Sequence, residues 1–450
     1  MTLPRYPAYR DSGVEWLGEV PAHWRAGKII MFAKLESGHT PSRQHPEYWE
    51  DCSIPWFSLA DVWQIRDGNQ RYVSETKEQV SELGLANSSA RLLPKGTVIL
   101  SRTASVGFSA IMAIDMATTQ DFANWVCSPD LLPEFLQYDL SGMKTEFDRL
   151  MMGSTHQTIY MPDIRKLAIA VPPLAEQHAI ATFLDRETAK IDGLVREQER
   201  LIELLAEKRR AVVSHAVTKG LDPNAPMKDS GIDWLGEVPA HWEVIQLKRD
   251  LEFLTSGSRG WAEHYADDGA LFIRIGNLTR DGIGLDLSDI QRVAVPEGAE
   301  GARTRLRTGD VLFSITAYLG SVAVVPEDLE EAYVSQHVAL ARLRQHRLLP
   351  SWVALVTLSY VGSTYLGTQG YGGTKIQLSL DDVANAIMTC PPLDEQRVII
   401  AYLDRETSKL DVLKTEAERA VALLKERRAA LISAAVTGKI DVRGRVEEAA

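Results

Sequence analysis

An internal duplication is the feature that most restricts the fold of this chain. The segment Asp11–Trp24 returns as Asp229–Trp242 with two conservative differences. Far downstream in each half, Pro172–Gln177 matches Pro391–Gln396, again about 220 residues apart. Because the offset is nearly constant at both ends, a whole half was duplicated, and the fold must contain two similar units.

The two halves share one order of parts. A short segment with two tryptophans opens each half, and a more divergent body, a Pro-Pro pair and a long charged stretch follow. The bodies are rich in glycine, proline and short β-branched runs such as Gly96–Leu100 and Leu271–Ile275, which is typical of mixed α/β domains with many short strands. We therefore predict an α+β protein with these parts: a first globular domain at 1–171, a first long helix at 172–220, a linker and repeated opening segment at 221–242, a second globular domain at 243–390, a second long helix at 391–440 and a tail at 441–450.

The stretches after the Pro-Pro pairs carry an apolar repeat of seven. Its members are Leu184, Ile191, Gln198, Leu205 and Val212 with Leu194 and Leu201 between them, and then Leu403, Leu410, Ala417, Leu424 and Leu431 with Leu413 and Ala420 between them. A repeat of seven sustained over four heptads predicts coiled-coil helices. Two matching helices in one duplicated chain favour packing against each other over packing along their own bodies. A pseudo-two-fold relation would make them antiparallel and would separate the two globular domains.

Composition narrows the class of protein. The chain has 450 residues, a net charge of −12 and 45% hydrophobic residues, as in an ordinary globular protein. No apolar run approaches the ~18 residues of a membrane span, and the start lacks the apolar core of a signal peptide. The three cysteines form no C-x-x-C pair. These features predict a cytoplasmic protein with reduced cysteines.

The sequence lacks the common catalytic motifs. There is no G-x-x-x-x-G-K-[ST] loop, no H-E-x-x-H helix and no G-x-S-x-G elbow, which argues against P-loop ATPases, zincins and α/β-hydrolases. The Pro-Pro pairs lack the preceding Asn or Asp of an amino-methyltransferase loop, so we interpret them as helix starts. His39, His45 and Glu47 share a loop but have no second cluster, so no metal site is predicted. The duplicated His23 and His241 are expected to pack rather than to catalyse. Four tryptophans are expected in the core rather than in base-stacking positions: Trp56, Trp63, Trp125 and Trp352.

Several motifs together resemble the specificity subunits of type I restriction-modification enzymes. They are the repeated Asp229–Trp242 segment, the Pro-Pro-Leu-x-Glu-Gln helix starts, Leu-Asp-Arg-Glu-Thr at 184–188 and 403–407, and the ending Ala435–Val442. The start of the first body, Ser37–Arg43 followed by Ile54–Trp56, also resembles the family's first target-recognition domain. The resemblance covers essentially the whole chain, although Leu254–Trp261 in the second body lacks the Thr-Pro of the first.

The resemblance implies two target-recognition domains that read the two parts of a bipartite, asymmetric DNA sequence. It implies that the long helices set the spacing and dock two modification (methyltransferase) subunits, which would bind S-adenosylmethionine and methylate adenine at N6. A restriction subunit, where present, would add translocation and cleavage that depend on ATP and Mg. On this reading the chain itself binds no cofactor and is not an enzyme.

Candidate DNA contacts follow from side-chain chemistry, because recognition domains vary too much within the family for a target sequence to be transferred. Arginine and glutamine suit phosphates and base edges, and those in glycine-rich loops or at matched positions of the two halves are the best candidates. For each, a phosphate-positioning or solvated role is as compatible with the sequence as base readout. The candidates are Arg43, Gln44, Arg102, Thr103, Gln120, His156, Gln157, Arg259, Arg274, Thr316, Tyr318, Gln336, Lys375 and Gln377.

The acidity of the chain bears directly on DNA binding. Residues 25–171 carry 14 basic and 17 acidic side chains, and residues 243–390 carry 13 and 18. Domain-wide basicity is the usual electrostatic footprint of a DNA-binding protein, so this chain alone should hold DNA weakly and should need partners to supply positive charge. Two alternatives remain open: a bivalent protein-interaction scaffold that does not touch DNA, and a fused enzyme with an unrecognised active site.

Overall fold

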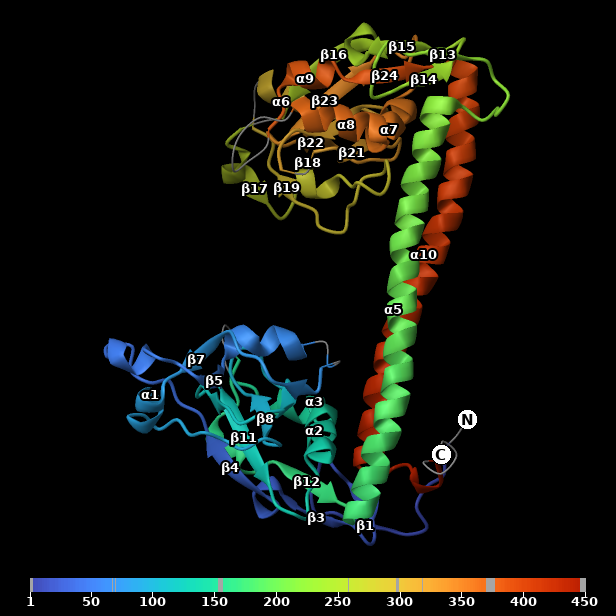
Figure 1. Cartoon of the computed structure of the whole chain (residues 1–450). Coiled ribbons are helices and arrows are strands. Elements are labelled where there is room, and N and C mark those ends of the chain that lie inside the picture. Colours follow the sequence, from blue (N-terminus) through green and yellow to red (C-terminus); the bar gives the residue numbers. More distant parts are fainter. Residues whose placement is uncertain are drawn as a thin grey trace. The chain divides into compact units, whose positions relative to one another are not determined.

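The protein consists of two mixed α/β bodies joined by two long helices that pack together, which confirms the predicted fold class (Figure 1). The computed structural model describes residues 3–66, 68, 70–152, 157–257, 259–296, 299–317, 319–369 and 377–445. The chain divides into two compact units, of which unit 1 holds residues 1–198 and 419–450 and unit 2 holds residues 199–418. The long helices α5 (Leu174–Lys219) and α10 (Leu393–Val436) each contribute to both units. Each unit therefore combines one body with part of each long helix.

The first body is built around a five-stranded sheet of order β4-β11-β8-β9-β6. A three-stranded sheet (β10-β5-β7) and the pairs β1-β2 and β3-β12 complete it. Its elements are β1 (Tyr9–Asp11), β2 (Glu19–Pro21), β3 (Arg25–Lys28), η1 (Ile29–Met31), β4 (Ala33–Ser37), η2 (Pro46–Trp49), β5 (Ile54–Phe57), η3 (Leu59–Ile65), β6 (Tyr72–Val73), β7 (Glu78–Val80), α1 (Glu82–Ala86), β8 (Val98–Ser101), β9 (Ser109–Met112), β10 (Ala117–Thr118), β11 (Phe122–Cys127), α2 (Pro133–Gly142), α3 (Lys144–Leu150), α4 (Met161–Ile164) and β12 (Ala168–Val171).

The second body repeats this plan with two four-stranded sheets, β16-β23-β20-β21 and β17-β19-β18-β22. The pairs β13-β14 and β15-β24 correspond to β1-β2 and β3-β12. Its elements are β13 (Met227–Asp229), β14 (Glu237–Pro239), β15 (Glu243–Gln246), η4 (Leu247–Arg249), β16 (Leu251–Ser256), η5 (Trp261–His264), β17 (Tyr265–Ala266), β18 (Ala270–Ile273), η6 (Ile275–Asn277), β19 (Arg292–Val293), α6 (Ala299–Thr304), β20 (Val311–Ser314), β21 (Val322–Val324), β22 (Ala332–Val334), β23 (Val338–Leu343), α7 (Pro350–Leu358), α8 (Tyr360–Gln369), α9 (Leu380–Ala384) and β24 (Ile387–Cys390); a last turn, η7 (Arg443–Arg445), follows α10.

The sheet register shows that the two bodies are versions of one fold. In the first body β5 pairs in parallel with β10, with Phe57 opposite Thr118. In the second body β18 pairs in parallel with β22, with Ile273 opposite Val334. The strand that follows in each case, β11 or β23, then runs antiparallel to β8 or β20. The duplication seen in the sequence therefore extends through the divergent bodies.

The duplicated opening segment and the Pro-Pro-Leu-x-Glu-Gln motif meet at the start of each long helix. Trp24 Nε1 donates to Glu176 Oε1 at 3.0 Å, and His23 Nε2 lies 2.8 Å from Glu176 Oε2. In unit 2, Trp242 Nε1 and His241 Nε2 contact Glu395 at 3.0 and 2.7 Å. The helices begin directly after the Pro-Pro pairs, as the helix-start interpretation predicted. These duplicated histidines therefore hold the body to its helix.

The largest hydrophobic core of each unit joins its body to the start of one long helix and the end of the other. In unit 1 the core around Trp24 and Trp125 includes Leu184 of α5 and Val436 of α10. In unit 2 the core includes Val217 at the end of α5 together with further residues of α10: Ile399 and Leu403. The apolar faces at the helix ends are therefore used for packing against the bodies.

Only some residues of the apolar repeat of seven are buried in the structure. Leu184, Ile191 and Leu205 of α5 are buried, as are three residues of the α10 repeat: Leu403, Leu410 and Ala417. Within unit 2, Arg209 pairs with Asp411, and Gly220 at the end of α5 lies beside Glu395 at the start of α10, so the segments run antiparallel.

Three of the four intermediate positions expected in the contact are exposed, and the fourth, Ala420, is half-buried. Leu194 and Leu201 are 51% and 40% exposed, and Leu413 is 51% exposed. The expectation for these three residues is wrong, because a helix of 3.6 residues per turn drifts away from a strict repeat of seven. Val195, one position on from Leu194, is buried instead. Within the described part of the chain, no helix is long and apolar enough to cross a membrane.

Candidate nucleic-acid interface

Three loops of the first body converge at the end of its central strands. The Arg102 amide donates to the Asp121 carbonyl, and the Ile159 amide donates to the Arg102 carbonyl, each at 2.9 Å. The Ala104 amide donates to the Gln157 carbonyl at 2.9 Å. A fourth segment joins through the His39 amide, which donates to the Thr118 carbonyl at 3.0 Å. We call residues 38–40, 101–105, 118–121 and 157–159 the first platform.

The second body builds the same arrangement from matched residues. The Ile315 amide donates to the His337 carbonyl at 3.1 Å, and the Leu378 amide donates to the Ile315 carbonyl at 2.9 Å. A further segment joins through the Gly257 amide, which donates to the Val338 carbonyl at 3.1 Å. We call residues 257, 314–317, 335–338 and 377–378 the second platform. The structure thus gathers seven of the fourteen candidate residues into two equivalent surfaces.

Backbone requirements show how tightly the platforms are built. A Cβ on Gly38 would lie 2.2 Å from the Thr118 carbonyl oxygen, and a Cβ on Gly257 would lie 2.1 Å from the Ser335 carbonyl oxygen. Ala104 and Ala317 both have a φ of 59°, a left-handed conformation that alanine rarely adopts. Such conformations persist only where the surrounding structure enforces them, and they cluster at functional sites.

Arg102 is the cation that the first platform holds most firmly. Its Nη2 donates to the Gln120 carbonyl at 2.6 Å and its Nη1 to the Ile159 carbonyl at 3.4 Å. Its buried Nε has no hydrogen-bond partner within the described residues. Burial lowers the pKa of Arg102, and the nearby Asp121 carboxylate partly offsets this effect. A guanidinium is still charged after such a shift, so Arg102 offers a pre-positioned positive charge.

Glutamines stand at the same turn in both platforms and are both exposed. Gln120 Oε1 accepts from Thr40 Oγ1 at 2.8 Å, which leaves its NH₂ group free to donate outward. Gln336 Nε2 lies 3.1 Å from His337 Nε2. Neither Thr40 nor His337 was among the sequence candidates, because only the fold brings Thr40 to the Gln120 turn.

Further candidates lie on the platforms or directly beside them. Thr103 forms an isolated β-bridge with Thr158, and Thr316 forms one with Gln377. Arg274 directly follows Ile273, whose strand partner is Val334, and therefore lies next to the second platform. Its Nη2 donates to Asp289 at 3.0 Å, so part of its charge is already compensated.

The remaining candidates lie off the platforms or outside the description. Arg43 stacks 3.7 Å from the Trp49 ring and pairs with Glu78 at 2.5 Å, so its charge is engaged within the body. Gln44 and Arg259 are exposed in their loops. Three candidates lie outside the described residues: His156, Tyr318 and Lys375.

One tryptophan contradicts the expectation of burial. Three of the four tryptophans expected in the core are buried: Trp56, Trp125 and Trp352. Trp63 is 71% exposed, because η3 turns its Val62 and Ile65 face toward the core. Arg66 lies three residues after Trp63, and a 3-10 helix has three residues per turn, so the two side chains point to the same side. Arg66 donates to Ser105 Oγ at 3.3 Å. Trp63 thus stands close to the first platform.

The described residues contain no group of three or more His, Cys, Asp or Glu side chains that could hold a metal ion. Of the three residues His39, His45 and Glu47, which share a loop, His45 and Glu47 contact each other, with 3.0 Å between Nδ1 and Oε1.

Comparisons with known proteins agree with this picture. A family model described as the type I restriction modification DNA specificity domain matches residues 21–203 and 295–420. The MjaIX specificity subunit of Methanocaldococcus jannaschii is 25% identical over 280 residues, which cover 61% of this chain and 62% of that protein. The EcoKI specificity subunit of Escherichia coli K12 is 22% identical over 451 residues, which cover 96% of this chain and 92% of that subunit.

A solved structure is similar over nearly the whole chain. It is a chain from a study of complex assembly and conformational transition in the type I R-M system, with a TM-score of 0.66 at 19% identity. The match covers 93% of this chain and 98% of that one. At this identity the likeness supports the fold.

Proposed function

The chain belongs to the family of type I restriction-modification DNA specificity subunits, and from that premise we propose that its two platforms read the two parts of a bipartite, asymmetric DNA target. Specificity subunits are non-catalytic within their complex, and the family match confirms the prediction that this chain is not an enzyme. On this proposal residues 1–171 and 243–390 are the two target-recognition domains.

The observation that carries the proposal is one backbone arrangement with two sets of side chains. Arg102 of the first platform is replaced by Ile315 in the second, although both make the same pair of backbone hydrogen bonds. Gln120 and Gln336 keep one position and are held by different neighbours. A shared scaffold with different donors suits two different half-sites, because arginine pairs with guanine and glutamine with adenine in the major groove.

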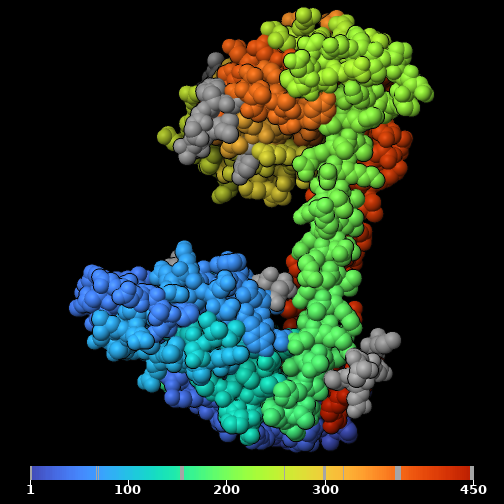
Figure 2. All heavy atoms as spheres, in the orientation of Figure 1, coloured from blue at the N-terminus to red at the C-terminus, as the bar shows by residue number. Residues whose placement is uncertain are grey.

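Matched apolar side chains on the long helices support docking of two modification subunits. Leu204 of α5 and Leu423 of α10 occupy equivalent positions and are 45% and 55% exposed. Leu194 and Leu413 form a second exposed pair, and Figure 2 shows the uncovered face of α5 in green. Exposed apolar residues that recur at matched positions are typical of protein interfaces. The partners would bind S-adenosylmethionine, and a restriction subunit, where one exists, would use ATP and Mg.

Methylation mapping tests the proposal directly. The assembled complex with its modification subunit should methylate adenines within one bipartite sequence, and Arg102→Ala should weaken methylation of that sequence by ~10-fold or more. Arg427→Ala, an exposed substitution on α10, is the matched control. Methylation of one half-site motif only, or equal methylation of all sequences, would contradict the proposal.

The two alternatives give different results. A protein-interaction scaffold would assemble with partners yet show no sequence preference for duplex DNA at any salt concentration, whereas specific binding should weaken steeply as salt rises. A fused enzyme would transfer methyl groups or cut DNA without partner subunits. The net charge of −12 favours DNA recognition by the chain assembled with partner subunits, because the chain alone lacks the positive charge to hold DNA.

A further inference from the structure

Each body sends a loop of identical sequence toward the long helices of its own unit. The loop reads Arg-Asp-Gly at 66–68 in the first body, where the structure describes Arg66 and Gly68, and at 280–282 in the second. It follows η3 or η6, the short helix after the strand that pairs in parallel. Just beyond the loop, the Ile111 amide donates to the Arg71 carbonyl, and the Val324 amide donates to the Ile283 carbonyl, each at 2.8 Å. The two Arg-Asp-Gly loops therefore occupy equivalent places beside the strands β9 and β21.

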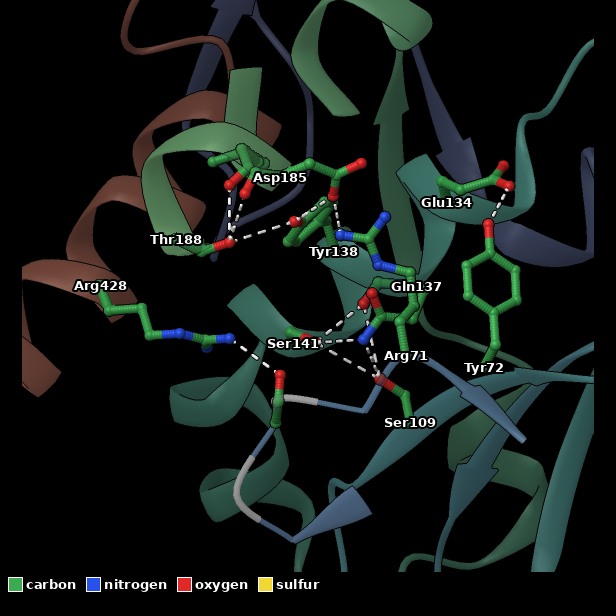
Figure 3. A network of polar contacts seen from close by, with 12 residues as sticks. Arg71, Tyr72, Ser109, Glu134, Gln137, Tyr138, Ser141, Asp185, Thr188 and Arg428 are labelled. Carbon is green, nitrogen blue, oxygen red and sulfur yellow. Dashed lines mark hydrogen bonds and ion pairs between the residues drawn. The ribbon is translucent and has the colours of Figure 1, made fainter. Parts of the chain in front are cut away.

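An arginine of a long helix meets each loop. Arg428 Nε donates to Asp192 Oδ1 at 2.9 Å, and its Nη2 donates to the Gly68 carbonyl at 2.8 Å. Figure 3 shows the second of these two hydrogen bonds as a dashed line from Arg428. One side chain thus joins α10, α5 and the first body. The side chain is 20% exposed, so solvent screens these contacts less than it would at an open surface.

The second unit repeats the contact with matched residues. Arg209 of α5, equivalent to Arg428, pairs with Asp411 of α10, equivalent to Asp192. A Cβ placed on Gly282 would lie 3.9 Å from Arg209 Nη2, so the second Arg-Asp-Gly loop also reaches the interhelical pair. Asp281 of the same loop lies 3.5 Å from Lys414 Nζ of α10.

The Arg-Asp-Gly loops are also tied to the recognition surfaces. Arg66 of the first loop donates to Ser105 Oγ of the first platform at 3.3 Å. In the second body, the Val322 amide donates to the carbonyl of Thr279 just before the loop, at 3.2 Å, and Val322 begins the strand that follows the second platform. Residues of each loop region therefore lie close to the interhelical arginine on one side, and on the other side contact the platform or the strand that follows it.

Close packing does not hold the bodies to the helices at these points. A cavity of about 310 Å³ lies beside Gly68 and Arg428, and one of about 940 Å³ lies beside Arg280 and Asp281. Near the first, Arg71 pairs with Asp185, which also accepts from Tyr138 at 2.6 Å (Figure 3). Away from the apolar cores at the helix ends, each body therefore contacts the long helices at its loop through a few polar interactions.

We propose that Arg428 and Arg209 are positioning residues for target recognition, each locking its unit's platform to the helix pair through the Arg-Asp-Gly loop. This inference rests on the proposed function, because it concerns how accurately two half-sites are read at one separation. A body released from its interhelical arginine would rock on the helices. The complex would then accept targets whose half-sites are wrongly spaced.

The test uses the full chain assembled with its modification subunits and the target found by methylation mapping. Duplexes carry that target with its spacer unchanged, one base pair longer or one base pair shorter. Arg428→Lys is the key variant, because lysine can keep a charge near Asp192 but lacks the fork that also reaches the Gly68 carbonyl. Arg209→Lys repeats the test in unit 2, and Arg427→Ala and Lys208→Ala are exposed neighbours that serve as controls.

The expected result is a loss of spacing discrimination of about tenfold in both lysine variants, with none in the controls. Unchanged discrimination in the lysine variants would overturn the inference. A structural readout is independent of DNA: spin labels at Leu92→Cys and Glu197→Cys, both in unit 1 and both exposed, should give a broader distance distribution in Arg428→Lys. An identical distribution would also overturn it. A parent complex that methylates nothing would refute the proposed function, and the label distances would still decide the positioning role.

Discussion

Replacing Asp139 with valine should stabilise unit 1. Asp139 is fully buried on α2, and neither carboxylate oxygen has a hydrogen-bond partner within the described part of the chain. Burial raises the pKa of Asp139 well above its ordinary value of 3.8. At the equivalent position of α7, six residues after the helix-starting proline, stands the fully buried Val356. The fold thus already accommodates valine at this place.

The size of the effect depends on pH. Below about pH 4 both the folded and unfolded chains carry a protonated Asp139, and the cost is that of an unpartnered neutral group, ~1–3 kcal/mol. As pH rises further, the unfolded chain releases the proton while the folded chain keeps it. The free energy of unfolding then falls by about 1.4 kcal/mol per pH unit until the raised pKa is passed. Valine does not titrate, so the advantage of Asp139→Val should grow from pH 4 to pH 7.

Calorimetric unfolding of the full chain between pH 4.5 and 8 measures this difference. Two units allow two transitions, so hydrogen exchange in α2 should identify the transition of unit 1. Asp148→Asn on α3 changes an exposed carboxylate and should leave the pH profile as in the parent. A variant that is less stable than the parent at pH 7, or a stability difference that does not change with pH, would refute the reasoning.

Three other substitutions test separate parts of the structure. Gly38→Ala should destabilise the first platform by ~1–3 kcal/mol, because the new Cβ meets backbone oxygen, whereas Gly276→Ala has open space and should be neutral in thermal unfolding. Leu205→Glu combined with Leu424→Glu should lower the free energy of unfolding in urea by ~2–4 kcal/mol, because charges enter the apolar contact of the helix pair. Unchanged assembly and target preference would count against that packing. Trp63→Ala should weaken target binding by ~1–3 kcal/mol if its exposed ring stacks on DNA, and an unchanged Kd in fluorescence anisotropy would exclude that role.

Some of the arrangement was predictable because it depends on local or repeated patterns. The matched Asp11–Trp24 and Asp229–Trp242 segments predicted two similar units, and the apolar repeat of seven predicted long paired helices. The heptad pattern wrongly predicts Leu194 and Leu413 in the contact, because it does not reveal how far a helix drifts around its axis. Trp63 was expected in the core because hydrophobic character alone does not tell which face of a short helix turns inward.

The duplication, the class of fold, the helix starts at the Pro-Pro pairs and the family can be read from the amino-acid sequence, since they follow from residue order and spacing. Which loops meet is a property of the folded chain alone. Thr40 reaches Gln120, Arg66 reaches Ser105, and Arg428 reaches Gly68, each across a long stretch of chain. Such contacts depend on strand register and on the path of the chain between elements, which leave no periodic signal in the sequence. The candidate side chains could therefore be chosen by chemistry, but their grouping into two platforms tied to interhelical arginines required the fold.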